Sequence, residues 1–450
     1  MLTQLNFENF KTWRSADIKF GKITGLFGVN SSGKSSIIQF LLLLKQTKEA
    51  TDRSIALDLN GPYATLGAYK DVIFKHDEKR NLVWTIDYST GKELSITDPS
   101  KKRTSTLAKA RNINTSSGVT ARGQNITSTH LRYDAGVLSV SLTTKGMRER
   151  NFVLSSRGGG FRFKRTRGRP WQLPGPIKSY AYPDQARTYF QNASFLADLE
   201  AAYEEQIDAI FYLGPLREFP QRDYLWARTR PRDVGIRGEK AIDAILAATI
   251  AEERRNIRKK AHLMPFQEMI AYWLAEMGLI WSFKVEEIAK GSNRWQAKVQ
   301  VRENGSEALL TDVGFGVSQV LPVITLLQYV PSNSTVILEQ PEIHLHPLAQ
   351  ANLADVIINA AVHRNVQIIL ESHSEHFLLR LQRRIAEGKI DSGDVRMYFC
   401  EYERSSSSAK ELDLDLLGNI TNWPKKFMGD AFSETYAAEK ARIKRGRKSA

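Results

Sequence analysis

A glycine-rich stretch near the start of the chain contains the clearest chemistry in the sequence. Residues 28–36 read Gly-Val-Asn-Ser-Ser-Gly-Lys-Ser-Ser and fit the phosphate-binding pattern Gly-x-x-x-x-Gly-Lys-Ser/Thr. Glycines let the backbone wrap a phosphate so that successive N–H groups point at it, and the dipole of a following helix adds positive charge. The lysine brings a mobile cation to the β- and γ-phosphates, and the next serine hydroxyl can ligate Mg²⁺. The stretch predicts a site for ATP or a similar nucleoside triphosphate with Mg²⁺.

Local context supports this interpretation. Residues 23–27 are typical of a short buried strand, and residues 37–44 of an apolar helix, so the motif lies in the strand–loop–helix setting that it requires. Ser35 is also the first expected metal ligand. The residues expected to bind the phosphates are Asn30, Ser31, Ser32, Gly33, Lys34, Ser35 and Ser36.

Two later stretches supply the other half of such a site. Residues 335–342 form a β-branched apolar run that ends in an acid, as a buried parallel strand delivering a carboxylate to Mg²⁺ would; the alternative is an acid that only caps a turn. Glu339 is therefore the second expected metal ligand. A similar strand, residues 366–370, would bring His373 to the same sheet edge. A functional role in the nucleotide site is favoured there over the alternative of a histidine that only stabilises the fold.

A second glycine-rich turn, at residues 314–316, precedes an apolar helix. Its N–H groups at a helix start can bind an anion, which makes Gly316 and Ser318 further candidates for the nucleotide site. One chain rarely needs two such turns for one nucleotide. We therefore expect this turn to face the nucleotide of another subunit, which predicts a homo-oligomer.

Composition limits the class of protein. The chain has 450 residues with 42% hydrophobic content, which fits a globular protein of roughly two to four domains. Its longest apolar runs are too short to cross a bilayer, and its first residues lack the order of a signal peptide. A lone cysteine, Cys400, excludes an internal disulfide and a cysteine-based zinc site. We expect a cytoplasmic protein without a membrane partner.

Positive charge is concentrated in one region. Residues 101–170 contain 16 Lys and Arg against 2 acids, a difference of +14 in a chain of net charge +15. Residues 161–171 interleave these cations with aromatic residues, whose faces can stack on bases. A polyanionic partner, either nucleic acid or an acidic protein surface, is favoured over the alternative of a solvated loop.

The remaining sequence predicts a mixture of strands and helices. Residues 66–74 are expected to form a turn and a strand, and residues 238–277 two helices parted near Pro265, with the charged run 252–255 in the first. Further strands are expected at 2–7, 18–20, 82–97, 137–143, 210–213, 281–288 and 295–302, and a further helix at 193–209.

Together these motifs resemble the ABC-type ATPase heads of the SMC, RecF and OLD kind, and more narrowly bacterial AAA-like ATPases with a short C-terminal domain of unassigned function. The resemblance rests on residues 9–11, 28–36, 66–67, 212–217, 233–239, the motifs from 312 onward, and the Trp-Pro segment at 418–427. It implies an α/β fold with a mixed sheet, a helical lobe and a basic insertion. The implied divisions are 1–100 (head), 101–190 (basic insertion), 191–304 (helical lobe), 305–405 (head) and 406–450 (C-terminal segment with a basic tail).

The resemblance also implies roles. Residues 316–319 would close on a partner's ATP, Glu339 would hold Mg²⁺, residues 345–347 would form a dimer-facing loop, and His373 would contact the γ-phosphate. Many such heads have a glutamate as general base after the metal-binding acid, where this chain has Gln340. An amide can orient water but cannot accept its proton. Glu342, His344 or His346 could serve instead, or hydrolysis is slow; the expected catalytic residues are Gln340, Glu342 and His373.

The implied function is an ATP-dependent, dimerising ATPase that acts as a switch or sensor in anti-phage defence or DNA maintenance. No nuclease motif is visible in the sequence, so an effector such as a nuclease would be a separate protein. The alternative is a nucleotide-gated scaffold with little or no hydrolysis, which Gln340 favours and His373 argues against. The ATPase subunit of a membrane transporter is disfavoured, because the basic region would have no evident use there.

Overall fold

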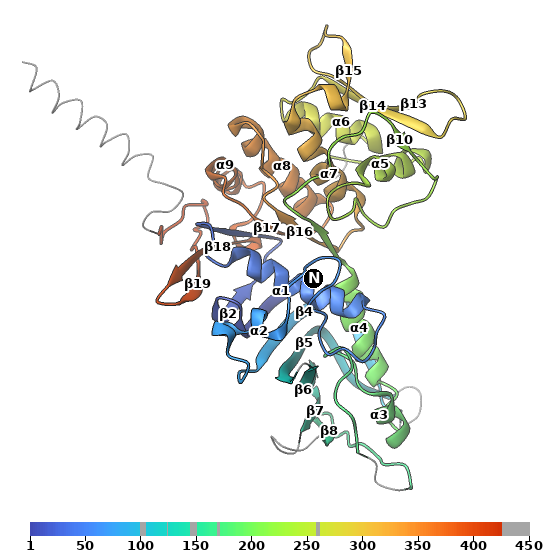
Figure 1. The fold of residues 1–450 in the computed structure, drawn as a ribbon, viewed down its shortest axis with the longest axis vertical. Coiled ribbons are helices and arrows are strands. Elements are labelled where there is room, and N and C mark those ends of the chain that lie inside the picture. Colours follow the sequence, from blue (N-terminus) through green and yellow to red (C-terminus); the bar gives the residue numbers. More distant parts are fainter. Residues whose placement is uncertain (100–104, 124, 145–150, 169–171, 258–261, 425–450) are drawn as a thin grey trace, which may run out of the picture.

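We describe the protein from a computed structural model, which covers residues 1–99, 105–123, 125–144, 151–168, 172–257 and 262–424. An antiparallel sheet of seven strands occupies the lower half of Figure 1. In pairing order its strands are β2 (Trp13–Lys19), β1 (Leu2–Phe10), β4 (Leu82–Thr97), β5 (Thr106–Arg122), β6 (Asn125–Ala135), β7 (Leu138–Thr144) and β8 (Phe152–Arg157).

A six-stranded mixed sheet contains the candidate site. Its strands pair in the order β19 (Ser406–Glu411), β18 (Val395–Glu403), β3 (Ile23–Gly28), β17 (Gln367–Glu371), β16 (Thr335–Glu339) and β9 (Ile210–Leu213). All are parallel except β19, so the carboxyl ends of five strands meet at one edge. Ligands of open α/β sheets bind at this edge. The α/β class and the mixed sheet expected from the sequence are thus confirmed.

Alternation along the central strands gives the sheet two buried faces. Ile337 and Ile369 belong to the core that contains helix α1 (Lys34–Glu49), whereas their neighbours Val336 and Ile368 belong to the core of the helices on the other face. Phe40 of α1 stacks on Phe7 of β1 at 4.8 Å between ring centroids, so α1 lies between the two sheets. Because side chains alternate along a strand, Glu339 and Glu371 project toward the α1 face.

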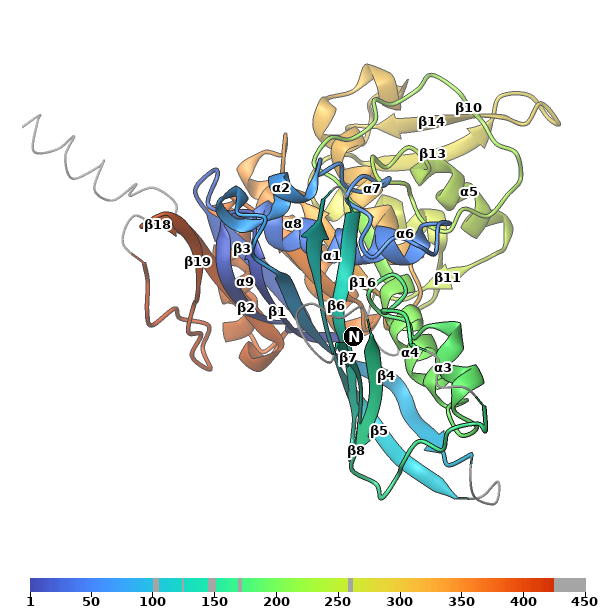
Figure 2. The ribbon, with the colours of Figure 1, turned by 60° about the horizontal axis from the view of Figure 1, so that its bottom comes forward.

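The helical lobe lies at the opposite end of the molecule from β5–β8 (Figures 1 and 2). It contains β10 (Tyr224–Leu225), α5 (Ala241–Ile250), β11 (Arg254–Arg255), β12 (Met264–Pro265), α6 (Phe266–Glu276), β13 (Ser282–Glu287), β14 (Arg294–Gln300), β15 (Glu307–Leu309), η2 (Leu310–Asp312) and α7 (Phe315–Tyr329). The other helices are α2 (Tyr69–Val72), η1 (Phe74–His76), α3 (Asp184–Tyr189), α4 (Leu196–Asp208), α8 (Pro347–His363), α9 (Glu375–Ala386) and η3 (Ser392–Asp394). Within the described ranges, no helix has both the length and the apolar character needed to cross a bilayer.

Two local predictions were wrong. A strand was expected within residues 66–74, but the structure has the helical turn α2 there. Asp71 stabilises the start of this turn, because its carboxylate accepts a hydrogen bond from the Ala68 N–H at 2.8 Å. The charged run 252–255 lies beyond α5, which ends at Ile250; Glu252 has a φ of 52°, which no helix continues, and the two arginines form β11.

The basic region is continuous with the first strands of the chain. Strand β5 pairs with β4 along its length, and β6, β7 and β8 extend the same sheet. The boundary expected between residues 100 and 101 therefore lies within one sheet, and the strands of the basic region do not form a separate appendage. The strand expected at 137–143 is β7.

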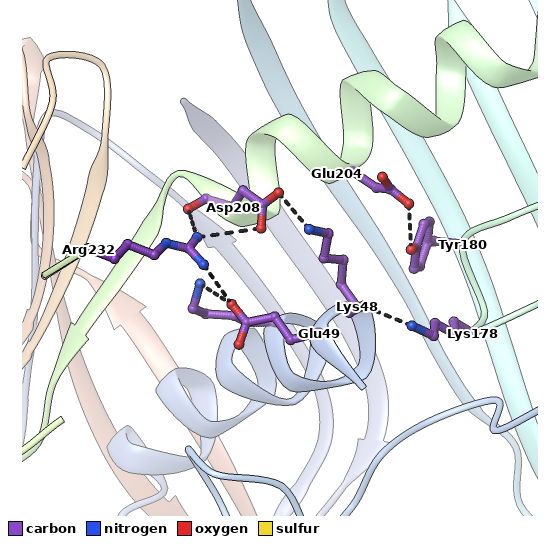
Figure 3. Close-up of polar contacts among 8 residues, drawn as sticks. Lys48, Glu49, Lys178, Tyr180, Glu204, Asp208 and Arg232 are labelled. Atoms are coloured by element: carbon purple, nitrogen blue, oxygen red, sulfur yellow. Dashed lines mark hydrogen bonds and ion pairs between the residues drawn. The ribbon is translucent and has the colours of Figure 1, made fainter. Parts of the chain in front are cut away.

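Charged contacts from three segments hold the end of α1 that is farthest from residues 28–36 (Figure 3). Lys178 donates a hydrogen bond to the carbonyl of Lys48 at 3.0 Å. A cation is favourable there because the last carbonyls of a helix lack partners within the helix and carry partial negative charge. Lys48 itself pairs with Asp208 at the end of α4 at 2.6 Å. Arg232, which precedes α5, reaches Glu49 at 3.4 Å. The helix that begins at the phosphate loop is thus anchored at its far end to Lys178, which follows the basic region, to α4 and to the entry of the helical lobe.

Candidate functional site

The phosphate loop follows β3 and is shaped by two glycines. Gly28 has a φ of 138°, and a Cβ there would lie 2.1 Å from the carbonyl oxygen of Cys400 on the neighbouring strand. Gly33 has a φ of 97° and precedes α1; a Cβ there would lie 2.6 Å from the indole nitrogen of Trp13, which donates to the Gly33 carbonyl at 3.1 Å. Both positions therefore require glycine, because a side chain would collide with neighbouring atoms.

Lys34 is folded back onto this loop. Its side chain is 3% exposed, and its ammonium group donates to the carbonyls of Gly28 at 3.1 Å and Val29 at 2.9 Å. It also lies 3.7 Å from Glu371. Asn30 and Ser31 form the exposed rim of the loop, whereas Ser32 and Ser36 are buried. The hydroxyl of Ser32 has no hydrogen-bond partner among the described residues.

A carboxylate that the sequence interpretation did not select contacts the serine of the motif. Ser35 donates to Glu371 at 2.7 Å, whereas the expected second metal ligand, Glu339, accepts from the hydroxyl of Tyr212 at 2.8 Å. Glu339 and Glu371 are register partners on adjacent parallel strands. The structure thus adds Glu371 between the two expected metal ligands. Only the position of Glu371 at the end of a predicted strand hinted at this role.

Burial governs the charges at this edge. It raises the pKa of Glu339 to about 7, and the negative charge of Glu371 raises this pKa further. The hydrogen bond from Tyr212 and the positive charge of Arg217 act in the opposite direction. Arg217 is 6% exposed, and burial lowers its pKa to about 10. It donates to the backbone carbonyl of Glu339 at 3.4 Å, while two of its other nitrogens have no partner in the described part of the chain.

Tyr212 and Arg217 were missed as site residues for a simple reason. Both belong to a run that was assigned to an expected strand and to the family resemblance but not to the site, and its neighbour in space, β16, is more than a hundred residues later. Pairing of β9 with β16 in parallel brings this run to the carboxyl edge of the sheet.

The three expected catalytic residues lie around the same edge. Gln340 has a φ of 45° and its N–H donates to the carbonyl of Glu371 at 2.9 Å. Glu342 is buried and accepts from the Ser372 hydroxyl at 2.8 Å and the His373 N–H at 2.6 Å, so one of its oxygens holds the turn before α9. Burial raises the pKa of Glu342. His373 is more exposed than the other two, and the partial burial of its ring together with the nearby charge of Lys34 lowers its pKa.

The second glycine-rich turn lies at the start of α7. Gly316 falls within the first turn of this helix, and Ser318 is 6% exposed with its hydroxyl donating to the Phe315 carbonyl at 2.9 Å. Among the hydrogen bonds of the described residues, none joins Gly316 or Ser318 to the phosphate loop of the same chain. Their N–H groups at the helix start are thus not engaged with that loop.

Exposed apolar side chains surround this turn. Phe315 is 46% exposed and meets Phe219, which is 66% exposed, at 5.5 Å between ring centroids. Phe315 also meets the ring of His344, at 5.6 Å between ring centroids. His346 accepts from the N–H of Leu348 and begins α8, which leaves Leu348 itself exposed. The residues expected to form a dimer-facing loop therefore adjoin an apolar surface.

Residues 161–171, the basic segment, differ from the expectation in how Phe161 and Phe163 lie. Phe161 is buried and meets Phe195 at 5.0 Å, and Phe163 stacks on Phe195 at 6.1 Å. Core packing therefore takes up the ring of Phe161 and one face of Phe163, which is itself partly buried. Arg169 and Trp171 lie outside the described residues. The exposed cations, none in an ion pair among the described residues, are Arg162, Lys164, Arg165 and Arg167.

Comparison with known families gives two matches. A family described as "AAA domain, putative AbiEii toxin, Type IV TA system" matches residues 23–380. A family described as "Protein of unknown function (DUF3696)" matches residues 390–436. Among curated proteins, none matches the chain.

Several solved structures are similar in fold. The SMC head domain from Thermotoga maritima shares 11% identity at a TM-score of 0.42, covering 92% of this chain and 99% of that one. An SMC head bound to the C-terminal winged-helix domain of ScpA shares 12% identity at 0.44, with coverage of 92% and 98%. An SMC head with an extended coiled coil, bound to the C-terminal domain of ScpA derived from Pyrococcus furiosus, shares 11% identity at 0.46, with coverage of 92% and 96%.

Proposed function

The chain belongs to the AAA-domain family described as putative AbiEii toxins of type IV toxin–antitoxin systems, and we propose that it is an ATP-driven switch. In this proposal Mg²⁺·ATP binds at the phosphate loop and draws two copies together, and hydrolysis separates them. The associated state engages a separate effector, such as a nuclease, and a nucleic acid, in anti-phage defence or DNA maintenance. The observation that supports nucleotide binding most strongly is the buried network of Lys34, Ser35 and Glu371 under the glycine loop.

The residues present fit a magnesium ion with a triphosphate. Ser35 and Glu339 would hold Mg²⁺ with Glu371 beside them, since hydroxyl and carboxylate oxygens are the ligands that this ion prefers. When bound, the ion neutralises charge that develops on the phosphate oxygens. Lys34 must leave the carbonyls of Gly28 and Val29 to reach the phosphates, and the N–H groups of residues 30–36 would bind them.

The remaining edge residues would then act on water and the terminal phosphate. Gln340 would orient the attacking water, and His373 would donate or accept a hydrogen bond at the γ-phosphate. Glu342 keeps His373 in place through the backbone hydrogen bond of 2.6 Å. Association of two copies is supported by the exposed aromatic pair Phe219 and Phe315, which lies beside the glycine-rich turn at the start of α7.

A change at Gln340 tests the hydrolytic half of the proposal. We expect Gln340→Glu to raise ATP turnover by at least about tenfold, since it restores a proton acceptor beside the terminal phosphate. Phosphate release from purified protein at saturating Mg²⁺·ATP measures this rate. Gln340→Ala serves as the control for loss of the amide. Unchanged or lower turnover in Gln340→Glu would show that another group, such as Glu342 or a histidine, already accepts the proton.

A scaffold with little or no hydrolysis is the second candidate function. The position directly after Glu339 holds the amide of Gln340, which cannot accept a proton from water. This favours slow or absent hydrolysis, and therefore a scaffold. The wild-type rate of phosphate release separates the two functions: turnover that exceeds the uncatalysed rate and is lost in Lys34→Ala supports the switch, and ATP-dependent association without turnover supports the scaffold.

The exposed cations of the basic segment support contact with nucleic-acid phosphates. Their neighbour Phe161 is buried and Phe163 is partly buried against Phe195, so we expect the contact to involve backbone phosphates more than stacked bases. Binding of this type releases counterions, and log affinity then falls linearly with log salt concentration.

Removal of these cations should flatten that slope. We expect replacement of Arg162, Lys164, Arg165 and Arg167 by serine to reduce the salt slope on duplex DNA by about 3.6, from four lost phosphate contacts, with ATP binding unchanged. Fluorescence anisotropy with duplex DNA and RNA over a salt series measures the slope. The matched control replaces four exposed cations elsewhere: Lys79, Lys92, Arg302 and Lys389. An equal slope in both variants, or binding that is insensitive to salt, would return the segment to a solvated loop.

A further inference from the structure

The buried carboxylate of Glu371 contacts two side chains that a nucleotide would use, the ammonium group of Lys34 and the hydroxyl of Ser35. Glu371 is 3% exposed; one of its oxygens accepts from Ser35 at 2.7 Å and the other lies 3.7 Å from the ammonium group of Lys34. Triphosphate binding needs Lys34, and metal binding needs Ser35. Glu371 and the incoming ligand therefore compete for the same two side chains.

A second carboxylate stands directly beside the first. Glu339 is the register partner of Glu371 on the adjacent strand, and both side chains project to the α1 face. Adjacent strands lie about 4.8 Å apart. Metal-free ATP carries about four negative charges, and repulsion between such charges is strong where water is excluded. Lys34 alone cannot neutralise both the phosphates and Glu371.

From this arrangement we propose that Glu371 is a specificity-determining residue that admits ATP only together with its divalent cation. The inference rests on the proposed nucleotide site. With Mg²⁺, the cation compensates Glu339 and Glu371 when Lys34 moves to the phosphates and Ser35 to the metal. Without Mg²⁺, the same movement of Lys34 leaves Glu371 as an uncompensated buried charge next to the phosphates. Metal-free nucleotide is therefore rejected.

Neutralising Glu371 separates its charge from its shape. Glutamine has the same size, and its amide oxygen still accepts the hydrogen bond from Ser35, whereas the negative charge is lost. The backbone carbonyl at this position, which accepts from Gln340, is unaffected by the change. A purely structural role would thus survive Glu371→Gln.

The experiment compares nucleotide affinity with and without metal. Binding of a fluorescent ATP analogue is measured by anisotropy in excess Mg²⁺ and in excess EDTA, so the readout does not depend on turnover. For the wild type we expect EDTA to weaken binding by at least about 100-fold. For Glu371→Gln we expect the affinity in EDTA to rise at least about tenfold over the wild type. The matched control is Glu375→Gln, an exposed carboxylate at the start of α9, which should retain wild-type metal dependence.

The outcomes distinguish this inference from the proposed function. If the wild type binds Mg²⁺·ATP and Glu371→Gln shows the same loss in EDTA, the selectivity does not come from Glu371 and the inference is overturned, while the nucleotide site stands. If the wild type binds no nucleotide in Mg²⁺, the proposed function itself fails. Glu371→Asp and Glu371→Asn form a second pair that differs only in charge; this pair gives the same comparison if the glutamine variant does not fold.

Discussion

Replacing Lys34 with alanine is expected to weaken binding of Mg²⁺·ATP by at least about 100-fold, because each charge-assisted hydrogen bond contributes about 1.5–3 kcal/mol and the lysine can offer more than one. Its ammonium group makes two hydrogen bonds to carbonyls of the loop and lies 3.7 Å from Glu371, so it starts beside the loop and would turn from these acceptors to the β- and γ-phosphates. Isothermal titration calorimetry at fixed Mg²⁺ and ionic strength measures the affinity.

Two controls separate binding from folding. Lys22→Ala removes a lysine that pairs with Asp394 at 2.8 Å with a 38% exposed side chain, and should leave ATP affinity unchanged. Lys34→Ala also strands the buried carboxylate of Glu371, which destabilises the fold. The double variant with Glu371→Gln removes that charge, so its melting temperature should recover while binding of Mg²⁺·ATP remains lost. Micromolar affinity for Mg²⁺·ATP in Lys34→Ala would contradict the assignment of this site.

The second large effect is expected at Phe315. Phe315→Asp should abolish ATP-dependent association, because it places a charge in the exposed aromatic pair with Phe219 beside the start of α7. Binding of ATP by the monomer should be unchanged, because Phe315 is outside the phosphate loop. Ser318, the obvious choice from the sequence, is a poorer target: it is buried and bonded to the Phe315 carbonyl, so a bulky residue would disturb α7 itself.

Multi-angle light scattering with and without ATP measures this association. Val137→Asp is the matched control, since Val137 is an exposed apolar residue, 67% accessible, in the turn between β6 and β7 of the antiparallel sheet. It should associate as the wild type does. Undiminished association of Phe315→Asp would mean that copies meet through another surface, and the proposal that the turn of α7 faces the nucleotide of a second copy would have to be abandoned.

The local elements of the site could be predicted from the sequence because their patterns are short. The loop at 28–36, the strand that ends at Glu339 and the strand before His373 each lie where the residue types predicted. Which strands are neighbours could not be predicted. Strand β17 lies between β3 and β16, so Glu371 rather than Glu339 meets Ser35. A linear pattern contains no information on this order.

The basic region shows a second limit of the sequence. Its composition changes abruptly near residue 101 and suggests a separate unit, yet β5 pairs with β4 across that boundary. Residue types also left open which way Phe161 and Phe163 point; both pack against Phe195, with Phe161 buried and Phe163 partly buried. Charge is visible in a sequence, whereas the face on which an aromatic ring lies depends on partners that are distant along the chain.

The most direct measurement is a structure determined with Mg²⁺ and a non-hydrolysable ATP analogue. The account predicts the triphosphate against the N–H groups of residues 30–36, with the side chain of Lys34 moved from the Gly28 carbonyl to the phosphates. It also predicts the turn at residues 316–318 of a second copy closing over the γ-phosphate. A saturated complex in which the nucleotide lies away from residues 28–36, or in which no second copy approaches it, would contradict the account.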